Sequence, residues 1–587
     1  MNYNSVLGKD WISKKFNDEK VKFLKENFNL SDTLSKLIAI RNIRLEEVKM
    51  YLEPKIKNFL PNPYILKDME KTVLRAIKAI TNNEKIGIFG DYDVDGATST
   101  AILGNYFKEI GREIEIYIPD RKTEGYGPSE KAFNKLISNG SNLIFTVDCG
   151  TLSFETISYS RTKNIDVIVL DHHQAETNLP NAYSLINPNR YDDESKLNYL
   201  CAAGVCFMFL VALNKKLREI EWFKKNNKIE PNLINYLDLV ALGTVCDVVP
   251  LIGLNRAFVS QGLEIMRKRS NPGLKILKSV CGIENNITTY HLGYILGPRI
   301  NAGGRVGKCS HGANLFLSKN SKEIFKIASE LERFNNERKQ IEFEMLDKIE
   351  KKITIDKTKP FIILSGHNWH SGIIGIVASR LKEKFNKPTV IISVVDKIGK
   401  ASARSVFGFD IGSMIINAVQ LNILLKGGGH KMAGGFSIKE DNITKFKNFI
   451  NKSFLKIEKD IKKSNEIFFD SIISPSAVNH DFYNEINSLS PFGSGNPEPK
   501  FVIENLELIK STIVGDKHIK SILVGQDGSV VKSVTFNAVE TDLEAYLFAK
   551  NQKKINIFGK LSLNEWKGKK NVEFIIDDIS VNKSKYN

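Results

Sequence analysis

The stretch KIGIFGDYDVDGATS, residues 85–99, joins a short apolar run to three aspartates on alternate positions. The run KIGIFG has the composition of a buried strand, and the residues from Thr98 onward have the pattern of a helix. Asp91, Asp93 and Asp95 therefore lie between a strand and a helix. In open parallel sheets, ligands bind at this carboxyl edge. The stretch predicts an α/β fold with a carboxylate-rich site.

The same DxDxDG spacing also begins the calcium-binding loop of an EF-hand. That loop needs a bidentate glutamate at its twelfth position, where this chain has Ile102. It also follows a helix, whereas the element predicted before Asp91 is a strand. The sequence therefore favours a strand-end site over an EF-hand.

Two further predicted strands end in residues that can bind a cation. NLIFTVD ends at Asp148, and DVIVLD ends at Asp171, which is followed by His172 and His173. If the sheet is parallel, these ends share one edge with the first three aspartates. Two carboxylates about 5 Å apart repel each other by roughly 3 kcal/mol at an effective dielectric constant near 20. Such a cluster predicts bound cations.

The ligand types indicate which cation the cluster would prefer. Carboxylate oxygens with one or two imidazoles suit Mn²⁺ or Mg²⁺ better than zinc, which favours cysteine and histidine. Asp247 lies in the otherwise apolar segment ALGTVCDVVPL, where an unpaired buried charge would be costly. We therefore include it as a further candidate ligand. Any one of these aspartates alone could be a helix cap or a turn residue.

The composition is that of a folded protein with several domains. The chain has 587 residues, of which 42% are hydrophobic and 26% charged. Its net charge of +17 favours a polyanionic partner, although lysine used only for solubility would give the same balance. The six cysteines form no CxxC pair, and we expect them to be reduced. With no signal peptide and no run long enough to span a bilayer, a cytoplasmic location is predicted.

The pattern of apolar residues divides the chain into five predicted regions. Alternating strands and helices indicate a parallel α/β sheet, and charged residues with helical spacing indicate a long connecting helix. A second, smaller α/β pattern and a run of short strands follow. The predicted regions are a helical extension (1–65), the parallel α/β domain with added helices (66–318), the connecting helix (319–355), the smaller α/β domain (356–455) and a β-barrel (456–587).

A second set of residues is basic or polar and flanked by glycines. Arg121 follows the predicted strand EIEIYIP, Arg299 and Arg305 lie in GPRINAGGR, and Ser402 and Arg404 lie in SARS. The guanidinium fork matches two phosphate oxygens, and glycine lets the backbone approach a ligand closely. The set indicates phosphate binding, whereas an isolated arginine is more often in a surface ion pair.

The ordered motifs resemble the DHH phosphoesterase superfamily. GDYDVDGATS, VDCG, the tripeptide Asp171-His172-His173 and LDLVALGTVCDVVPL occur in the order typical of that superfamily. LGPRINAGGRVG, WHSGIIGIVASRL, SARS and GGGHKMAGGF extend the similarity to its RecJ family of bacterial single-strand DNA exonucleases. The resemblance covers roughly residues 50–580. It implies a DHH domain joined by a long helix to a smaller DHHA1 domain, followed by an OB-like barrel.

The resemblance also implies a two-metal phosphodiesterase. Two closely spaced cations can bind a phosphodiester and activate water, so that no covalent nucleophile is needed. The implied ligands of two Mn²⁺ or Mg²⁺ ions are Asp93, Asp95, Asp148, His172 and Asp247, with Asp91 and Asp171 as further candidate ligands and His173 as an adjacent catalytic residue.

The implied substrate contacts are spread over three domains. By similarity, Arg121, Arg305, Ser402 and Arg404 hold the terminal phosphate and nearby backbone, and Arg299 belongs to the same basic set. His370 in WHSG and His430 in GGGHK are assigned to substrate contact. In the OB-like domain, where basic grooves and stacking aromatics bind single strands, the candidates are His518, Lys520 and Trp566.

The most favoured function is therefore metal-dependent 5′-to-3′ hydrolysis of single-stranded DNA to mononucleotides, in repair and recombination. The direction follows from the resemblance alone, as does a monomeric state. Single-strand-binding protein and a helicase are candidate partners. One alternative keeps the chemistry but acts on short oligonucleotides or cyclic dinucleotides, which the added barrel disfavours. The other is a non-catalytic single-strand-binding replication scaffold, which the retained acidic set disfavours.

Overall fold

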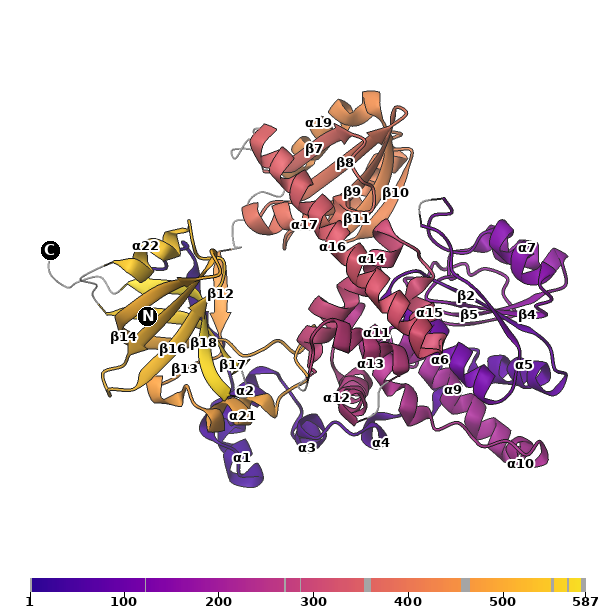
Figure 1. Ribbon diagram of the computed structural model, residues 1–587, viewed down its shortest axis with the longest axis horizontal. Helices are drawn as coiled ribbons and strands as arrows, with labels where there is room; N and C mark the ends of the chain where they lie inside the picture. The colour runs from indigo at the N-terminus through magenta and orange to yellow at the C-terminus, as the bar shows by residue number, and fades with distance from the viewer. Residues whose placement is uncertain are drawn as a thin grey trace. The chain divides into compact units, whose positions relative to one another are not determined.

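The computed structural model describes residues 3–121, 123–268, 271–284, 287–352, 360–455, 465–549, 554–566 and 569–581. The chain forms two units (Figure 1). Unit 1 comprises Met1–Asn58, Leu251–Gly253 and Lys463–Asn587, and unit 2 comprises Phe59–Pro250 and Leu254–Lys462. The predicted α/β class, with a long helix and a terminal barrel, is confirmed. The exact domain bounds stay a prediction.

A five-stranded parallel sheet forms the centre of the first half of unit 2. Its order is β3-β2-β4-β5-β6, so the chain reverses its direction of travel across the sheet between β2 and β4. Strands β2, β4 and β5 are buried almost throughout, as expected when helices cover both faces. Ligands bind at such a reversal point. The strands are β2 (Ile86–Gly90), β3 (Ile114–Tyr117), β4 (Leu143–Val147), β5 (Asp166–Leu170) and β6 (Ser184–Ile186).

Helices surround this sheet and extend it on one side. The first four alternate with the strands: α5 (Met69–Thr81), α6 (Val94–Glu109), α7 (Glu130–Ser138) and α8 (Phe154–Thr162). A mainly helical part follows, in which α9 and α11 pack on α6. It contains α9 (Ala202–Glu219), α10 (Trp222–Lys225), α11 (Leu237–Cys246), α12 (Gly253–Lys268), α13 (Pro272–Val280), a π-helix (His291–Leu296), α14 (Gly297–Val306) and α15 (His311–Leu317).

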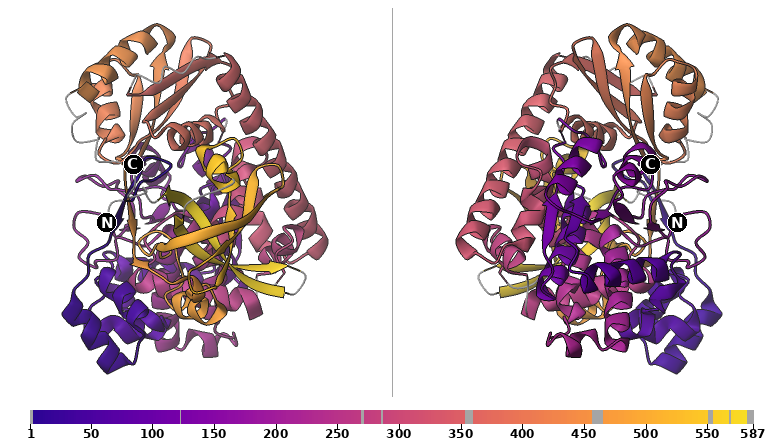
Figure 2. Two further views of the ribbon diagram at one scale, coloured as in Figure 1. Left: turned by 90° about the vertical axis from the view of Figure 1, so that its left-hand side faces the viewer. Right: turned by 90° about the vertical axis from the view of Figure 1, so that its right-hand side faces the viewer.

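The connecting helix α16 spans Ser321–Lys352 without a break and leads to the next sheet (Figures 1 and 2). It packs against α13, α14 and α15 near its start and against α17 near its end. Arg299 of α14 forms an ion pair with Glu332 of α16, and Lys384 of α17 pairs with Glu350 at 2.8 Å. The helix therefore ties together the two halves of unit 2.

The second sheet of unit 2 has the order β10-β11-β9-β8-β7. Strands β7 and β8 are parallel, and the other neighbouring pairs are antiparallel. Its strands are β7 (Ile362–His367), β8 (Thr389–Val395), β9 (Ile398–Arg404), β10 (Lys426–His430) and β11 (Ala433–Lys439). The accompanying helices are α17 (Ile374–Phe385), α18 (Ile411–Gln420) and α19 (Ile443–Leu455).

Unit 1 is built on a closed β-barrel. Strands β14, β15, β16, β18 and β17 pair in that order, and β17 pairs again with β14. The barrel strands are β14 (Phe501–Val514), β15 (His518–Val524), β16 (Val530–Thr535), β17 (Ile555–Trp566) and β18 (Lys569–Val581). Outside the barrel lie β12 (Glu466–Phe469), β13 (Ser471–Ile472), α21 (His480–Asn487) and α22 (Asp542–Phe548).

The N-terminal residues belong to the same unit as this barrel. Strand β1 (Asp10–Ser13) pairs in parallel with β12. Buried side chains from helices α1 and α2 join the core of the barrel, as Leu24, Leu37 and Ile38 show. The helices are α1 (Asp18–Phe28), α2 (Asp32–Ile40), α3 (Val48–Leu52) and α4 (Ile56–Phe59), of which α4 ends one residue beyond unit 1. In both units, no helix within the described residues is long and apolar enough to cross a membrane.

The barrel core gives the first prediction. Phe501 on β14 is 1% exposed, and Phe501→Ala should lower the stability of unit 1 by about 3 to 5 kcal/mol through lost burial and a cavity. Urea unfolding followed by far-ultraviolet circular dichroism measures the change. Ile509 lies on the same strand but is 62% exposed, so Ile509→Ala serves as the control. Equal midpoints for the two variants would contradict this account of the core.

Candidate metal centre and anion pocket

Three strand ends place carboxylates side by side at one edge of the parallel sheet. In the strand register, Gly90 of β2 lies opposite Val147 of β4, and Val147 lies opposite Leu170 of β5. The residue that follows each strand is an aspartate: Asp91 after β2, Asp148 after β4 and Asp171 after β5. Asp148 has a φ of 60°, a conformation that aspartate tolerates better than most residues. The parallel register alone therefore brings the three aspartates together.

Two further aspartates come from the start of helix α6. The helix begins at Val94, earlier than the sequence pattern suggested, because the Asp93 side chain caps it by accepting from Gly96 N at 3.0 Å. Asp95 therefore lies in the first turn. Its two carboxylate oxygens accept from the backbone N–H groups of Ala202 and Ala203 at 2.6 and 3.0 Å, at the start of α9. This contact fixes Asp95 at the edge of the sheet.

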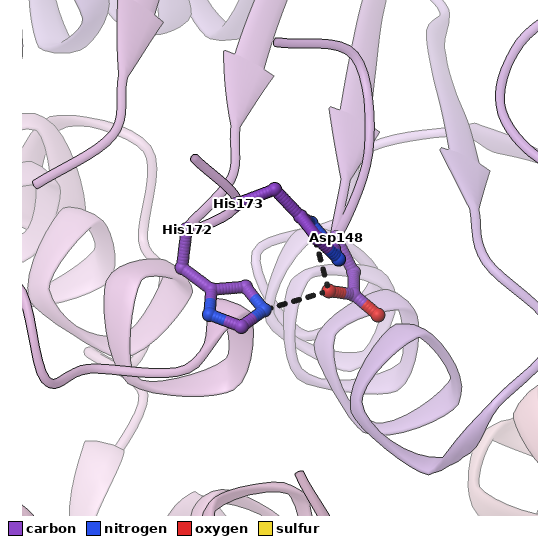
Figure 3. Close-up of side chains that lie close together, drawn as sticks. All are labelled: Asp148, His172 and His173. Carbon is purple, nitrogen blue, oxygen red and sulfur yellow. Dashed lines mark ion pairs between the residues drawn. The ribbon is translucent and has the colours of Figure 1, made fainter. Parts of the chain in front are cut away.

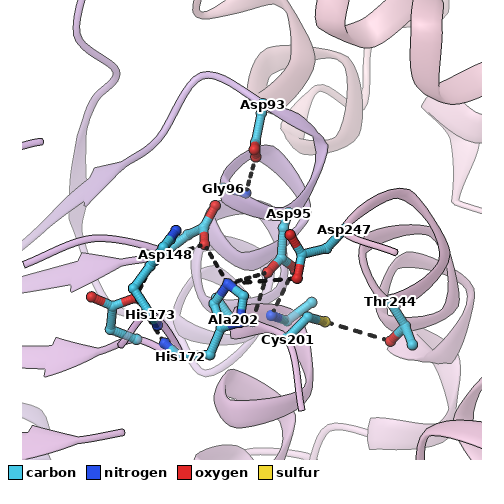
Figure 4. A network of polar contacts seen from close by, with 12 residues as sticks. Asp93, Asp95, Gly96, Asp148, His172, His173, Cys201, Ala202, Thr244 and Asp247 are labelled. Carbon is cyan, nitrogen blue, oxygen red and sulfur yellow. Dashed lines mark hydrogen bonds and ion pairs between the residues drawn. The ribbon is translucent and has the colours of Figure 1, made fainter. Parts of the chain in front are cut away.

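His172 lies at the centre of the cluster (Figures 3 and 4). Its Nε2 atom is 3.2 Å from Asp148 Oδ1, 3.6 Å from Asp247 Oδ2 and 3.8 Å from Asp95 Oδ2. Asn189 Nδ2 donates to the backbone carbonyl of His172 at 2.5 Å. One imidazole thus faces carboxylates from three separate elements.

Asp171 orients the histidines instead of facing the other carboxylates. Its Oδ1 accepts from the backbone N–H groups of His172 and His173 and lies 2.8 Å from His173 Nδ1, while Oδ2 accepts from Thr151 N at 3.0 Å. Burial opposes ionisation of Asp171, but the hydrogen bond and charge of His173, together with His172 and Thr151, outweigh burial and lower its pKa. The sequence placed Asp171 among the metal ligands, and that role stays a prediction.

Asp247 closes the cluster from the helical side. It is the C-terminal cap of α11, and the next residue, Val248, has a φ of 60°. A β-branched residue rarely adopts this conformation, and such strain concentrates at functional sites. Val248 is also 68% exposed. The backbone conformation of the turn that carries Asp247 is therefore maintained by tertiary contacts and not by the conformational preference of its residues.

Burial makes the full ionisation of this cluster unfavourable. It raises the pKa values of Asp91, Asp95 and Asp148, and neighbouring carboxylates add to the effect for each. Burial, followed by Asp95 and Asp93, raises the pKa of Asp247 to about 9. Burial likewise lowers the pKa of His172, which favours the neutral imidazole that metals bind.

His173 behaves differently from its neighbour. Burial opposes its protonation, but the hydrogen bond and ion pair with Asp171 outweigh burial and raise its pKa to about 9. His173 also lies 3.9 Å from Asp148 Oδ1. In the metal-free protein it therefore supplies positive charge at the rim of the acidic cluster.

The donor set fits divalent cations. Asp91 Oδ1, Asp148 Oδ1 and His172 Nε2 are buried and, within the described residues, accept or donate no hydrogen bond of good geometry. Three groups have ligand atoms within 4.8 Å of one another, and they share members. The groups are Asp91, Asp93 and Asp148; Asp95, His172 and Asp247; and Asp148, His172 and His173. Oxygen-rich groups with an imidazole suit Mn²⁺ or Mg²⁺.

Basic and polar side chains gather where the two halves of unit 2 meet, and we call this group of residues the basic pocket. Arg305 of α14 donates to the carbonyl of Gly372 at 3.0 Å. Arg404 at the end of β9 donates to Ser402 Oγ at 3.2 Å. A Cβ at Gly375, in the first turn of α17, would lie 3.0 Å from Ser402 Oγ and 3.2 Å from Arg404 Nη2. The two side chains therefore lie against the start of a helix, which attracts anions.

Other arginines add to the positive charge of this pocket. Burial, followed by the charges of Arg121, Arg338 and Arg404, lowers the pKa of Arg305 to about 10. The guanidinium of Arg121 lies 5.3 Å from the centre of the Tyr92 ring. His370 Nδ1 accepts from Gly372 N at 3.2 Å at the same turn. Such an excess of positive charge favours a bound phosphate.

The remaining predicted contacts lie elsewhere or are engaged. Arg299 forms its ion pair with Glu332, so its guanidinium is already matched. His430 is at the end of the exposed strand β10. In the sheet register it lies opposite Ala433 of β11, which in turn lies opposite Arg404 of β9. His518 belongs to unit 1, where it lies 5.1 Å from the ring of Phe536. The side chain of Trp566 lies outside the described residues.

Three contributors were missed at the sequence level. The Tyr126 hydroxyl donates to the carbonyl of Asp148 at 3.1 Å and lies 3.3 Å from His173 Nε2. Asn189, named above, follows β6, so a fourth strand end at the same edge was the available signal. Arg338 lies within α16 and pairs with Glu342 at 2.6 Å. In the sequence, Arg338 is one of many charged residues of this helix, and nothing distinguishes it from an exposed one.

Comparison with known proteins matches each part of this architecture. Three family models match: DHH family, N-terminal domain (residues 85–244), DHHA1 domain (358–456) and RecJ OB domain (469–578). The single-stranded-DNA-specific exonuclease RecJ of Escherichia coli (strain K12) is 34% identical over 94% of this chain and 96% of its own length. RecJ of Bacillus subtilis (strain 168) is 30% identical over 97% of this chain and 71% of its own length.

Solved structures agree with these matches. The crystal structure of RecJ in complex with Mn²⁺ from Thermus thermophilus has a TM-score of 0.79 at 25% identity, covering 98% of this chain and 79% of that chain. A crystal structure of exonuclease RecJ bound to manganese has a TM-score of 0.57 at 30% identity, covering 69% of this chain and 98% of that chain.

A glycine behind the cluster gives the second prediction. A Cβ at Gly243 would lie 2.7 Å from both Asp95 Oδ1 and Thr98 Oγ1. Gly243→Ala should therefore displace Asp95 and weaken Mn²⁺ binding by about 10- to 100-fold, as changes beside metal ligands do. Electron paramagnetic resonance of free Mn²⁺ measures the affinity. At Gly428 a Cβ would meet no atom within 4 Å, so Gly428→Ala is the control, and equal affinities would contradict the packing argument.

The raised pKa values give the third prediction. Carboxyls such as Asp247, with a pKa of about 9, carry protons at pH 7 when no metal is bound, and a cation must displace them. Mn²⁺ binding should release protons, and the affinity should rise with pH until pH 9 is reached. Calorimetric titration in buffers with different ionisation enthalpies counts the protons. Binding without proton release at pH 7 would show that the cluster is already ionised.

Proposed function

Since the chain belongs to the RecJ family of single-stranded-DNA-specific exonucleases, we propose that it degrades single strands from the 5′ end to mononucleotides. It is a metal-dependent hydrolase of single-stranded DNA that uses Mn²⁺ or Mg²⁺. The direction of cleavage, the mononucleotide product and the roles of single residues are the proposal. The observation that carries it is one unit holding both an acidic cluster and a basic anion pocket.

The acidic cluster supplies the reaction centre of this proposal. Asp91, Asp93 and Asp148 would hold one cation, and Asp95, His172 and Asp247 a second, in line with the two of the three groups of ligand atoms that share no member. When bound, such a pair of ions supplies Lewis-acid stabilisation of a phosphodiester and an activated water. His173, held by Asp171, is placed to exchange a proton at Nε2 beside the Tyr126 hydroxyl. No covalent nucleophile is required.

The basic pocket would set the direction of cleavage along the strand. Arg305, Ser402 and Arg404 would bind the phosphate at the 5′ end, with Arg121 and His370 close to the same anion. A terminal phosphate carries more negative charge than an internal phosphodiester, so a buried arginine pocket favours the chain end. Fixing the end at a set distance from the ions would release one nucleotide at each cut.

The barrel would hold the strand further from the cut. On one face of the sheet, Lys510, Ile522 and Lys532 lie opposite one another in register, and Lys520 is two residues from Ile522 on β15. Ile522 is 39% exposed. Lysines around an apolar centre bind a single strand through its phosphates and bases without reading its sequence. His518 belongs to the same strand, and its assignment to DNA contact stays a prediction.

Further parts of the proposal concern the surroundings of the enzyme. Single-strand-binding protein and a helicase are proposed partners, since a single strand must be exposed before it can be degraded. The six free cysteines fit a reducing compartment, which supports a proposed cytoplasmic location. A monomeric state completes the proposal.

The alternatives differ in their substrates. An enzyme for short oligonucleotides or cyclic dinucleotides needs no barrel, yet this chain carries one with a basic face. A non-catalytic scaffold needs no metal ligands, yet the ligand atoms of this cluster converge within 4.8 Å. Both observations favour the exonuclease.

Digestion of end-blocked DNA tests the proposal and gives the fourth prediction. An internally labelled single strand is blocked at the 5′ or the 3′ end and compared with a duplex, in Mn²⁺ and in chelator. A block at the 5′ end should prevent the release of mononucleotides, and a block at the 3′ end should not. The duplex, and the single strand in chelator, should also remain intact. Cleavage restricted to di- and trinucleotides would support the small-substrate alternative. Binding without any cleavage would support the scaffold.

The same assay tests the pocket. A 5′ phosphate should speed digestion relative to a 5′ hydroxyl, and Arg404→Ala should remove at least about tenfold of this preference by deleting a charged hydrogen bond. Arg333 on α16 has a side chain that is 66% exposed, so Arg333→Ala serves as the control. An unchanged phosphate preference in Arg404→Ala would place the end of the strand elsewhere.

A further inference from the structure

An exposed pair of tyrosines lies close to the end of helix α11. The rings of Tyr290 and Tyr294 have centroids 5.3 Å apart and planes inclined by 28°, so they are stacked. Tyr290 is 60% exposed and Tyr294 is 74% exposed. Two large rings that stack on each other but remain open to water contribute little to a core, and a flat ligand could extend the stack.

The segment that carries this pair is packed against the metal cluster's own helix. Cys246, the last residue of α11, donates through Sγ to the carbonyl of Leu292 at 3.4 Å. A Cβ at Gly297 would lie 2.6 Å from the same sulfur. Since Asp247 directly follows Cys246, the tyrosine-bearing segment is fixed beside a candidate metal ligand. Leu292 and Leu296 are fully buried, so the segment cannot move away easily.

The backbone of this segment is itself unusual. His291–Leu296 forms a π-helix, a geometry that is rare and often found at functional sites. Val248, whose strained backbone follows Asp247, is also exposed to solvent. Exposed apolar and aromatic side chains therefore lie on two segments that adjoin or contact the end of α11, directly after which the cluster's Asp247 is found.

The charges around the pair indicate which ligand would be attracted. Arg267 donates to the carbonyl of Ile287 at 3.1 Å, and Lys278 donates to the carbonyl of Met266 at 3.2 Å. Arg267 also acts on the carboxylate of Glu264, whose main partner is Lys268, so Arg267 and Lys278 together still place positive charge near this segment. Lys278 is also close enough to His291 to lower its pKa, after burial, which has the larger effect. Aromatic rings beside such cations suit a nucleic-acid strand, whose bases stack and whose phosphates attract cations.

We propose that Tyr290 and Tyr294 form a stacking platform for a base of the single strand whose backbone reaches the metal cluster. This inference rests on the proposed function and adds the residues that hold the strand at the cut. A base in a duplex is already stacked and paired, so it cannot lie on the rings. The platform would therefore add to the preference for single strands, without regard to sequence.

Binding measured without cleavage tests the platform. The full chain is titrated, in chelator, into fluorescently labelled single-stranded oligonucleotides, and anisotropy gives the Kd. One abasic residue is moved stepwise along the strand. In the wild type, an abasic residue at one or two positions should weaken binding by about tenfold, because one base loses its stack. The double variant Tyr290→Ala/Tyr294→Ala should bind intact DNA about tenfold more weakly and be insensitive to the abasic position.

Two controls separate stacking from loss of structure. Tyr294→Trp keeps an aromatic face and should retain the wild-type dependence on the abasic position. Phe325→Ala removes a ring from α16 that is 60% exposed, the same fraction as Tyr290, and should leave the Kd unchanged. Thermal unfolding verifies that each variant is folded.

The outcomes are distinguishable from those of the proposed function. Wild-type binding that ignores the abasic position, or a double variant that binds intact DNA like the wild type, would overturn the platform. An equal loss on every substrate, with the abasic dependence retained, would also overturn it. Digestion in Mn²⁺ is measured in parallel, so a failed platform with intact digestion leaves the exonuclease assignment in place.

Discussion

Mutual repulsion between buried carboxylates is the constraint on which this site depends. Asp95, Asp148 and Asp247 come from three elements and converge around the imidazole of His172, Asp91 lies beside Asp148, and burial raises the pKa of all four. Such an arrangement is unfavourable unless protons or cations neutralise it. The fold maintains it with hydrogen bonds outside the cluster, such as those from the start of α9 to Asp95. Divalent cations bound by these side chains would neutralise the cluster and supply Lewis-acid chemistry.

Much of this could be predicted because it follows from local sequence and sheet geometry. Short buried strands that end in aspartate place their carboxylates at one edge whenever the sheet is parallel, and the register from Gly90 to Val147 to Leu170 confirms that reasoning. The long helix followed from its apolar spacing, and the barrel from its short strands. The family resemblance added the order of the domains and the direction of cleavage, which no periodicity contains.

Other features depend on contacts that no local pattern reveals. Asp95 accepts hydrogen bonds from the start of a helix about a hundred residues later in the chain, and this is a tertiary contact. The ion pair that engages Arg299 is another. Asp171 is predicted as a ligand because it ends a strand, and that role stays a prediction; the contacts of its oxygens with backbone N–H groups and His173 could not be read from the sequence. The N-terminal region joins the barrel unit through buried side chains such as Leu24 and Leu37 and through strand β1, whose four residues are too few to stand out in the sequence.

The central claim is that this one cluster holds two ions. The most direct measurement is anomalous X-ray scattering from crystals grown with Mn²⁺, which locates manganese independently of the protein coordinates. The account predicts two peaks, one among Asp91, Asp93 and Asp148 and the other among Asp95, His172 and Asp247. A single peak, or peaks away from His172, would contradict it.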